Sequence, residues 1–176
     1  MKNSEVVIID YGMGNLLSVS RAFEHFGAKV TLAQNPEDID RAERLVLPGV
    51  GAFRDGMFEL ERRGFVDALK KYCREGRSLL GICLGMQMLM DESEEFGVFR
   101  GLGLVPGKVV AIPSKTTEDK PLKIPHIGWN RLRAVGSSEV WKGTILEDLV
   151  VEPYAYFVHS FRVMLLQPEN CLADAE

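Results

Sequence analysis

The segment Gly81-Ile82-Cys83-Leu84-Gly85-Met86-Gln87 constrains the fold of this chain more than any other feature. An apolar, strand-like run precedes it, and an amphipathic helical pattern follows it, so the turn between them must be tight. Glycines two residues either side of Cys83 leave room for a backbone that bends sharply without a Cβ clash. The pattern predicts a nucleophile elbow, with a thiol where related elbows carry a serine hydroxyl.

A thiol at this turn lies at the N-terminus of the following helix. The partial positive charge and the free N–H groups there stabilise a thiolate. The competing interpretation is a buried structural cysteine, because free Cys is among the most buried residue types. The glycine spacing favours the nucleophile.

Strands and helices alternate along the first half of the chain. We predict strands at 6–10, 29–33, 45–47 and 78–82, a helix after Asn15, and a helical stretch over 55–74 interrupted at Gly64. This alternation predicts an α/β fold in three layers, a mostly parallel open sheet with helices on both faces. Later strands, predicted at 104–112, 124–135 and 154–164, indicate an antiparallel extension.

Composition narrows the class of protein. A chain of 176 residues fits a single domain, 1–176, and its net charge of −4 without a basic block argues against nucleic acid or an anionic membrane as a partner. The odd number of cysteines, 3, argues against a disulfide framework and favours the reducing cytoplasm. We expect no signal peptide, no membrane span, no metal site and no cofactor.

Three loops are expected at one edge of the sheet, because ligands bind beyond the carboxyl ends of parallel strands. They follow Asp10, Leu47 and Ile82. The second, Pro48-Gly49-Val50-Gly51, together with the N–H of Leu84, could form an oxyanion hole, although an ordinary strand-ending turn explains it equally well. Gln87 shares a helix face with Cys83 and could bind a substrate amide or carboxylate, but an isolated helical Gln is usually solvated.

Other motifs are weaker. The segment 10–15, Asp-Tyr-Gly-Met-Gly-Asn, invites a phosphate-loop interpretation but lacks the third glycine of a dinucleotide fingerprint and the Gly-Lys of a P-loop. His159 could be a general base for Cys83 in a cysteine hydrolase, which requires the two side chains to lie within hydrogen-bonding reach. A structural role is more usual for a histidine in an aromatic strand, and the same holds for His126.

The elbow motif resembles that of the class I glutamine amidotransferases. Within that family the chain is similar to glutaminase subunits of imidazole glycerol phosphate synthase, an enzyme of histidine biosynthesis. Four segments carry this resemblance along nearly the whole chain: 10–15, 48–51, 125–130 and 156–161. A glutaminase of another pathway is the first alternative, because the elbow motif alone is shared more widely.

The resemblance implies roles for individual residues. Cys83 would attack the side-chain amide of glutamine, release ammonia and form a glutamyl thioester that water hydrolyses. The other implied roles are oxyanion N–H groups from Val50 and Leu84, glutamine binding by Gly51, Gln87, Ser160 and Phe161, and a partner interface at Asn15 and Trp129. The partner would be a (βα)8-barrel cyclase that receives the ammonia and makes imidazole glycerol phosphate and aminoimidazole carboxamide ribotide.

One departure from the family pattern affects the expected activity. The family places its catalytic histidine and glutamate in a His-Pro-Glu-Lys-Ser-like motif, which these 176 residues do not contain; they end at Ala173-Asp174-Ala175-Glu176. We therefore expect domain 1–176 to lack its C-terminal end and to have little glutaminase activity alone, since a cysteine depends on its base. A catalytically inactive cyclase-binding partner is accordingly a further alternative.

Overall fold

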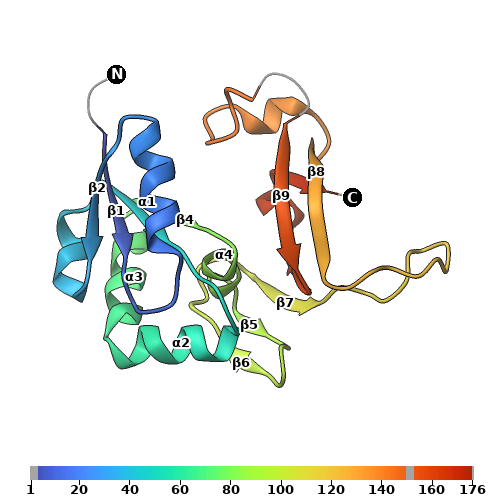
Figure 1. The fold of residues 1–176 in the computed structure, drawn as a ribbon, viewed down its shortest axis with the longest axis horizontal. Helices are drawn as coiled ribbons and strands as arrows, with labels where there is room; N and C mark the ends of the chain where they lie inside the picture. Colours follow the sequence, from blue (N-terminus) through green and yellow to red (C-terminus); the bar gives the residue numbers. More distant parts are fainter. Residues whose placement is uncertain (1–3, 150–152, 176) are drawn as a thin grey trace.

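The computed structural model describes residues 4–149 and 153–175, so Glu176 lies outside the described part (Figure 1). Its first half is built around a parallel four-stranded sheet in the order β2-β1-β3-β4. The elements of this half are β1 (Glu5–Ile9), α1 (Leu16–His25), β2 (Lys29–Ala33), the 3-10 helix η1 (Pro36–Arg41), β3 (Arg44–Leu47), α2 (Phe53–Arg62), α3 (Phe65–Arg74), β4 (Ser78–Gly81) and α4 (Leu84–Met88).

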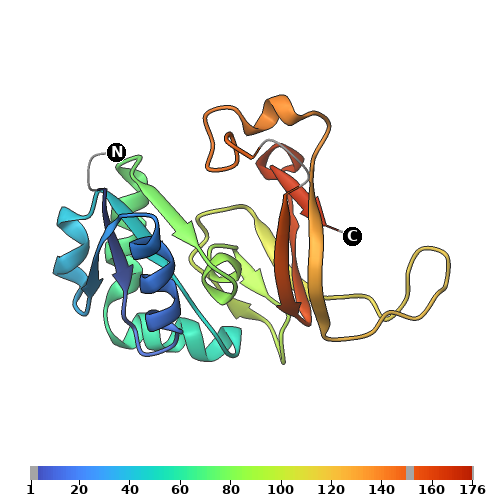
Figure 2. The ribbon, with the colours of Figure 1, turned by 45° about the horizontal axis from the view of Figure 1, so that its top comes forward.

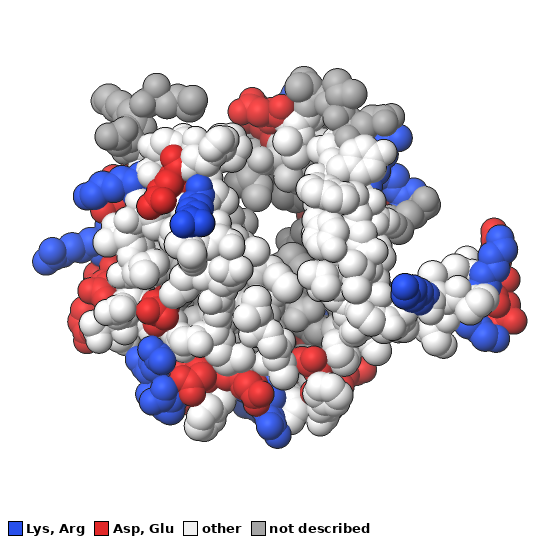
Figure 3. All heavy atoms as spheres, viewed as in Figure 1, with Lys and Arg blue, Asp and Glu red and all other residues white. Residues whose placement is uncertain are grey.

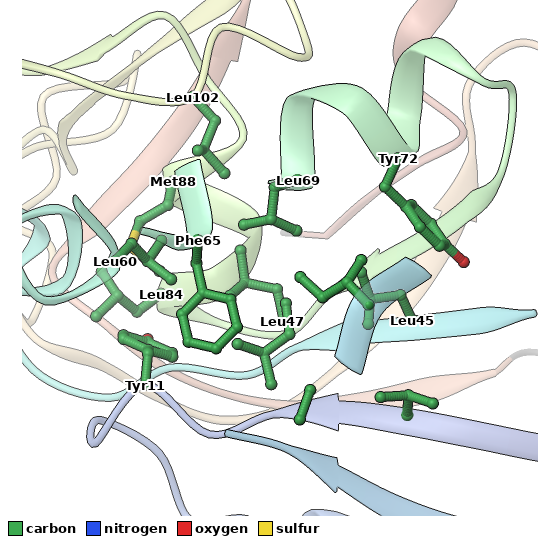
Figure 4. Packing of buried hydrophobic residues seen from close by; sticks show 14 of the residues in the cluster. Tyr11, Leu45, Leu47, Leu60, Phe65, Leu69, Tyr72, Leu84, Met88 and Leu102 are labelled. Atoms are coloured by element: carbon green, nitrogen blue, oxygen red, sulfur yellow. The ribbon is translucent and has the colours of Figure 1, made fainter. Parts of the chain in front are cut away.

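Alternate residues of the central strands bury opposite faces of this sheet, as the pleat of a strand requires. Val6, Ile8 and Val46 pack against α1. The residues next to these in β1 and β3 point to the opposite face of the sheet. There they join a larger core that includes side chains of α2, α3 and α4. Figure 4 shows this core, with Leu45 and Leu47 facing Phe65, Leu69 and Tyr72. The predicted three-layer α/β arrangement is confirmed.

Most predicted boundaries in this half are correct to within two residues. The helical stretch over 55–74 is divided where the sequence indicated, because Gly64 adopts a left-handed conformation with φ 76° between α2 and α3. Glycine has no Cβ and takes this conformation without strain.

The second half forms the predicted antiparallel extension. Its elements are β5 (Glu92–Ser93), β6 (Phe99–Arg100), β7 (Gly107–Ala111), β8 (His126–Ala134), η2 (Ser138–Trp141), β9 (Tyr154–His159), β10 (Phe161–Leu165), η3 (Pro168–Asn170) and β11 (Ala173–Ala175). These strands form two sheets, ordered β10-β7-β5-β6 and β11-β8-β9. Among the strands described in this half, β5 and β7 pair in parallel and the other pairs are antiparallel. The polar stretch 113–123 extends away from β8 and β9 (Figure 2).

One strand prediction is wrong. The predicted strand 154–164 is two strands, which separate at Ser160 because the chain leaves one sheet and enters another. β9 pairs with β8, whereas β10 pairs with β7, and the backbone N–H of Ile112 donates to the carbonyl oxygen of Ser160 at 2.9 Å.

Among the described residues, no helix combines the length and the apolar character needed to cross a bilayer.

Candidate active site

Cys83 occupies a strained turn between β4 and α4. Its backbone angles are φ 54° and ψ −116°, and it caps the N-terminus of α4. A positive φ is uncommon for a residue with a side chain, and strain of this kind concentrates at functional sites. The side chain of Cys83 is exposed. The turn therefore presents the thiol to solvent at the carboxyl end of β4, as the sequence predicts.

The elbow needs its glycines because the backbone of α4 lies directly against the strands. A Cβ on Gly85 would lie 1.8 Å from the carbonyl oxygen of Leu47, and one on Gly81 would lie 2.6 Å from the Cα of Met86. On the facing loop, a Cβ on Gly49 would lie 2.9 Å from the Cβ of Leu84. Close packing of α4 on β3 thus fixes where Cys83 points.

Tyr11 joins the first loop to the second. Its ring is fully buried, and its hydroxyl donates to the carbonyl oxygen of Pro48 at 2.9 Å. Burial raises the pKa of this hydroxyl well above its ordinary value, and the charge of a Cys83 thiolate raises it further. Tyr11 therefore stays protonated as a donor. The three loops predicted to converge do so.

A cavity of about 400 Å³ opens beside the elbow. One wall is formed by Cys83, Met86 and Gln87, and the facing wall comes from β9 and β10. Figure 3 shows the surface hollowed between the first half of the chain and the β8–β9 pair. The side-chain Nε2 of Gln87 donates across the cavity wall to the carbonyl oxygen of Phe161 at 3.3 Å. Gln87 is thus held in place, unlike the solvated Gln considered above.

Of the residues singled out from the sequence, Cys83, Gln87 and Phe161 line this cavity together. The described lining residues include neither Ser160, which lies at the break between β9 and β10, nor Val50 and Gly51. Val50 is exposed, and Gly51 has φ 104°, a conformation suited to glycine.

Leu84, Asn15 and Trp129 occupy other surroundings. The side chain of Leu84 is buried in the core, so only its backbone is available to a ligand. Asn15 caps α1, since its Oδ1 accepts from the N–H of Ser18 at 3.2 Å. Trp129 is 69% exposed on β8, with its ring edge-to-face against Tyr156.

His159 lines the cavity, but its hydrogen bonds lead away from Cys83. Its Nδ1 contacts the carbonyl oxygen of Phe161 at 2.8 Å, and its Nε2 lies 3.0 Å from Nδ1 of His126. Both ring nitrogens are therefore engaged. This arrangement does not support the cysteine-hydrolase alternative, in which His159 would accept the thiol proton.

Sequence reasoning missed one residue, Glu95, and one contact, that between His126 and His159. Glu95 accepts from the N–H of Phe53 at 2.7 Å and so holds the N-terminus of α2, just beyond the second loop. It stands in an acidic run, Glu92 to Glu95, which by itself indicates only a solvated segment. The contact between His126 and His159 joins residues far apart in the sequence, and no local pattern signals it. Within the described residues, no cluster of His, Cys, Asp or Glu is arranged to hold a metal ion.

Comparison with known proteins agrees with this geometry. The family model for class I glutamine amidotransferases matches residues 7–174. An imidazole glycerol phosphate synthase subunit HisH 1 of Legionella pneumophila (strain Lens) is 52% identical over 171 residues, which are 97% of this chain and 80% of that protein. The HisH subunit of Geobacillus thermodenitrificans (strain NG80-2) is 47% identical over 169 residues, 96% of this chain and 76% of that protein.

Solved structures share the fold at lower identity. PurLQS from Thermotoga maritima has a TM-score of 0.70 at 17% identity, covering 98% of this chain and 74% of that one. A crystal structure of a glutamine amidotransferase has a TM-score of 0.63, also at 17% identity, covering 86% and 70%. The α/β architecture, the strained cysteine elbow and the sequence matches all lead to one assignment: the chain belongs to the class I glutamine amidotransferase family.

Proposed function

We propose that this chain is the glutaminase subunit of an imidazole glycerol phosphate synthase. The observation that carries the proposal is the strained Cys83 beside a cavity in which Gln87 is held by the Phe161 carbonyl. The HisH relatives, each similar to nearly the whole chain, support the same pathway.

The proposed chemistry begins with attack of the Cys83 thiolate on the side-chain amide carbon of glutamine. The tetrahedral intermediate collapses, the C–N bond breaks, and the nitrogen leaves as ammonia with the proton that the Cys83 thiol gave up when it became a thiolate. Water then hydrolyses the glutamyl thioester, which releases glutamate and restores the thiol. No cofactor takes part in these steps.

Two backbone N–H groups would stabilise the oxyanion of that intermediate. Leu84 follows the nucleophile directly, and Val50 lies on the loop that Tyr11 anchors at Pro48. We expect the Val50 peptide to reorient when substrate binds, because Val50 does not line the cavity among the described residues. Gly51, Gln87, Ser160 and Phe161 would hold the glutamine, the last two through their backbones.

An exposed apolar face on β8 and β9 supports a partner subunit. More than half of the residue surface is exposed at each of four apolar positions, which are paired across the strand register: Ile127 with Val158 and Trp129 with Tyr156. Large exposed apolar patches commonly mark protein interfaces. We infer that this face, with Asn15, docks a (βα)8-barrel cyclase, which uses the ammonia to make imidazole glycerol phosphate and aminoimidazole carboxamide ribotide.

Two features of the chain concern its cellular compartment and its rate of glutamine turnover. Its three cysteines are unpaired, which favours the reducing cytoplasm. The 176 residues contain no His-Pro-Glu motif, and the nitrogens of His159 are engaged with other groups. We therefore expect slow turnover by this stretch of chain, because activation of the thiol depends on a neighbouring base.

The test is ammonia release from glutamine by the chain, measured with and without the cyclase subunit and its nucleotide substrate. Cys83→Ala removes the nucleophile, and Cys171→Ala is the matched control. Cyclase-stimulated release that only Cys83→Ala abolishes supports the proposal. Failure to bind the cyclase would favour a glutaminase of another pathway, and binding without Cys83-dependent release would favour an inactive binding partner.

A further inference from the structure

A continuous series of hydrogen bonds connects α4 to β8 through two histidines. Gln87 donates to the Phe161 carbonyl at 3.3 Å, and Nδ1 of His159 contacts the same oxygen at 2.8 Å. Nε2 of His159 lies 3.0 Å from Nδ1 of His126, whose Nε2 lies 3.0 Å from Oδ1 of Asn130. Side chains from α4, β8 and β9 and a backbone carbonyl from β10 thus meet in one network.

The chemistry of the acceptors fixes the proton positions. A carbonyl oxygen only accepts, so Nδ1 of His159 must carry the proton that meets Phe161. The Nε2 of a neutral His159 is then an acceptor, so Nδ1 of His126 must be the donor between the rings. Nε2 of His126 is then an acceptor as well, so Asn130 must turn its amide and donate from Nδ2 at the position where Oδ1 lies.

The Phe161 carbonyl oxygen connects the histidine pair to Gln87, which lines the cavity. A carbonyl oxygen has two lone pairs, and here Gln87 and His159 occupy both. Since Nε2 of Gln87 is used in this bond, its Oε1 is the atom that can accept from the N–H group of a ligand. The direction of the Phe161 carbonyl therefore decides which atom Gln87 presents.

Packing holds the histidine pair in this geometry. His126 and His159 are direct partners in the β8–β9 register, with ring centroids 5.1 Å apart. The ring of Phe157 stacks on His126 at 5.7 Å with an interplanar angle of 25°. Both histidines are partly buried, and side-chain networks in such surroundings hold their members more rigidly than exposed bonds do.

We propose that His159, supported by His126, is a positioning residue for glutamine, and this rests on the glutaminase function proposed above. His159 orients the Phe161 carbonyl, the carbonyl orients Gln87, and Gln87 presents Oε1 to the substrate. His126 contributes by holding His159 in the tautomer that donates from Nδ1. Neither histidine takes a proton from Cys83.

The experiment measures glutamine binding by isothermal titration calorimetry in a Cys83→Ala parent, which cannot turn the substrate over. In His159→Leu the Phe161 carbonyl loses a donor, and we expect glutamine to bind about tenfold more weakly. His159→Asn keeps an N–H near the position of Nδ1 and is expected to restore most of the affinity. His25→Leu, which alters the third histidine, is the matched control and should bind as the parent does.

A second measurement separates positioning from folding. Thermal melting identifies variants that bind weakly only because they unfold. The ¹⁵N NMR signals of the imidazoles should show His159 protonated at Nδ1, and His126→Leu should change the tautomer balance of His159.

The outcomes distinguish this proposal from the proposed function. A folded parent that does not bind glutamine would overturn both. A parent that binds glutamine, with a folded His159→Leu variant of equal affinity or with His159 protonated at Nε2, would overturn the positioning role alone.

Discussion

The contact between Gly85 and β3 makes a quantitative prediction for Gly85→Ala. The new Cβ would lie 1.8 Å from the carbonyl oxygen of Leu47, whereas non-bonded atoms prefer about 3.5 Å, so α4 and β3 must separate by about 1.7 Å. That oxygen also accepts from the N–H of Ile82 at 3.0 Å, and Leu84 and Met88 on α4 are buried in the core. The substitution therefore disturbs both a hydrogen bond and core packing.

The expected cost follows from those two effects. Weakening the hydrogen bond costs about 1 kcal/mol, and losing roughly half the burial of two apolar side chains costs about 2–3 kcal/mol. The sum, about 3–4 kcal/mol, is a large part of the roughly 5–15 kcal/mol typical of native stability. With a urea m-value of about 2 kcal/mol/M, the unfolding midpoint should fall by about 1.5–2 M.

Urea denaturation of Gly85→Ala and Gly14→Ala tests this reasoning. Gly14 is a matched control, because a Cβ there would lie 3.4 Å from its nearest neighbour, the Cγ of Pro48. Its midpoint should stay unchanged or rise slightly, since alanine restricts the unfolded chain more than glycine does. Equal midpoints for the two variants would refute the close packing of α4 on β3.

Three further predictions concern single side chains. Burial raises the pKa of the Cys73 thiol. In the folded protein, Cys73 should therefore react with a thiol reagent only at higher pH than the exposed Cys83 does. Equal reaction rates of the two thiols at pH 8, measured by peptide mass mapping, would contradict this. Tyr11→Phe leaves the Pro48 carbonyl without its donor and should lower the free energy of unfolding by about 1–2 kcal/mol, measured in urea; an unchanged value would show that the bond adds nothing. Replacing Trp129 and Tyr156 by Ser should weaken cyclase binding at least tenfold without lowering the melting temperature, and unchanged binding would place the interface elsewhere.

The sequence was sufficient for the architecture of the first half because local patterns and tertiary packing agree there. The elbow is a case in point: the glycines that predict it are those whose Cβ atoms the structure cannot accommodate. The break at Ser160 was missed for a physical reason. Partly buried and exposed residues alternate through β9 and β10 with the period of one strand, so nothing local marks the change of sheet.

The cavity wall that β9 and β10 form could not be inferred from the spacing of residues in the sequence alone. Gln87 and Phe161 are 74 residues apart, and the contact between them depends on how β10 pairs with β7. The resemblance placed both in one site, and the structure shows the bond that joins them. The roles assigned to Val50, Gly51 and Ser160 stay predictions.

The central claim, that Cys83 is the nucleophile of a glutamine site, is tested most directly by affinity labelling. The probe is a glutamine analogue whose side-chain amide is replaced by a chloromethyl ketone, which alkylates a thiolate without needing a general base. The account predicts one adduct per chain, mapped by mass spectrometry to Cys83 and slowed by excess glutamine. Labelling of Cys73 or Cys171 at a similar rate, or labelling of Cys83 that glutamine does not slow, would contradict it.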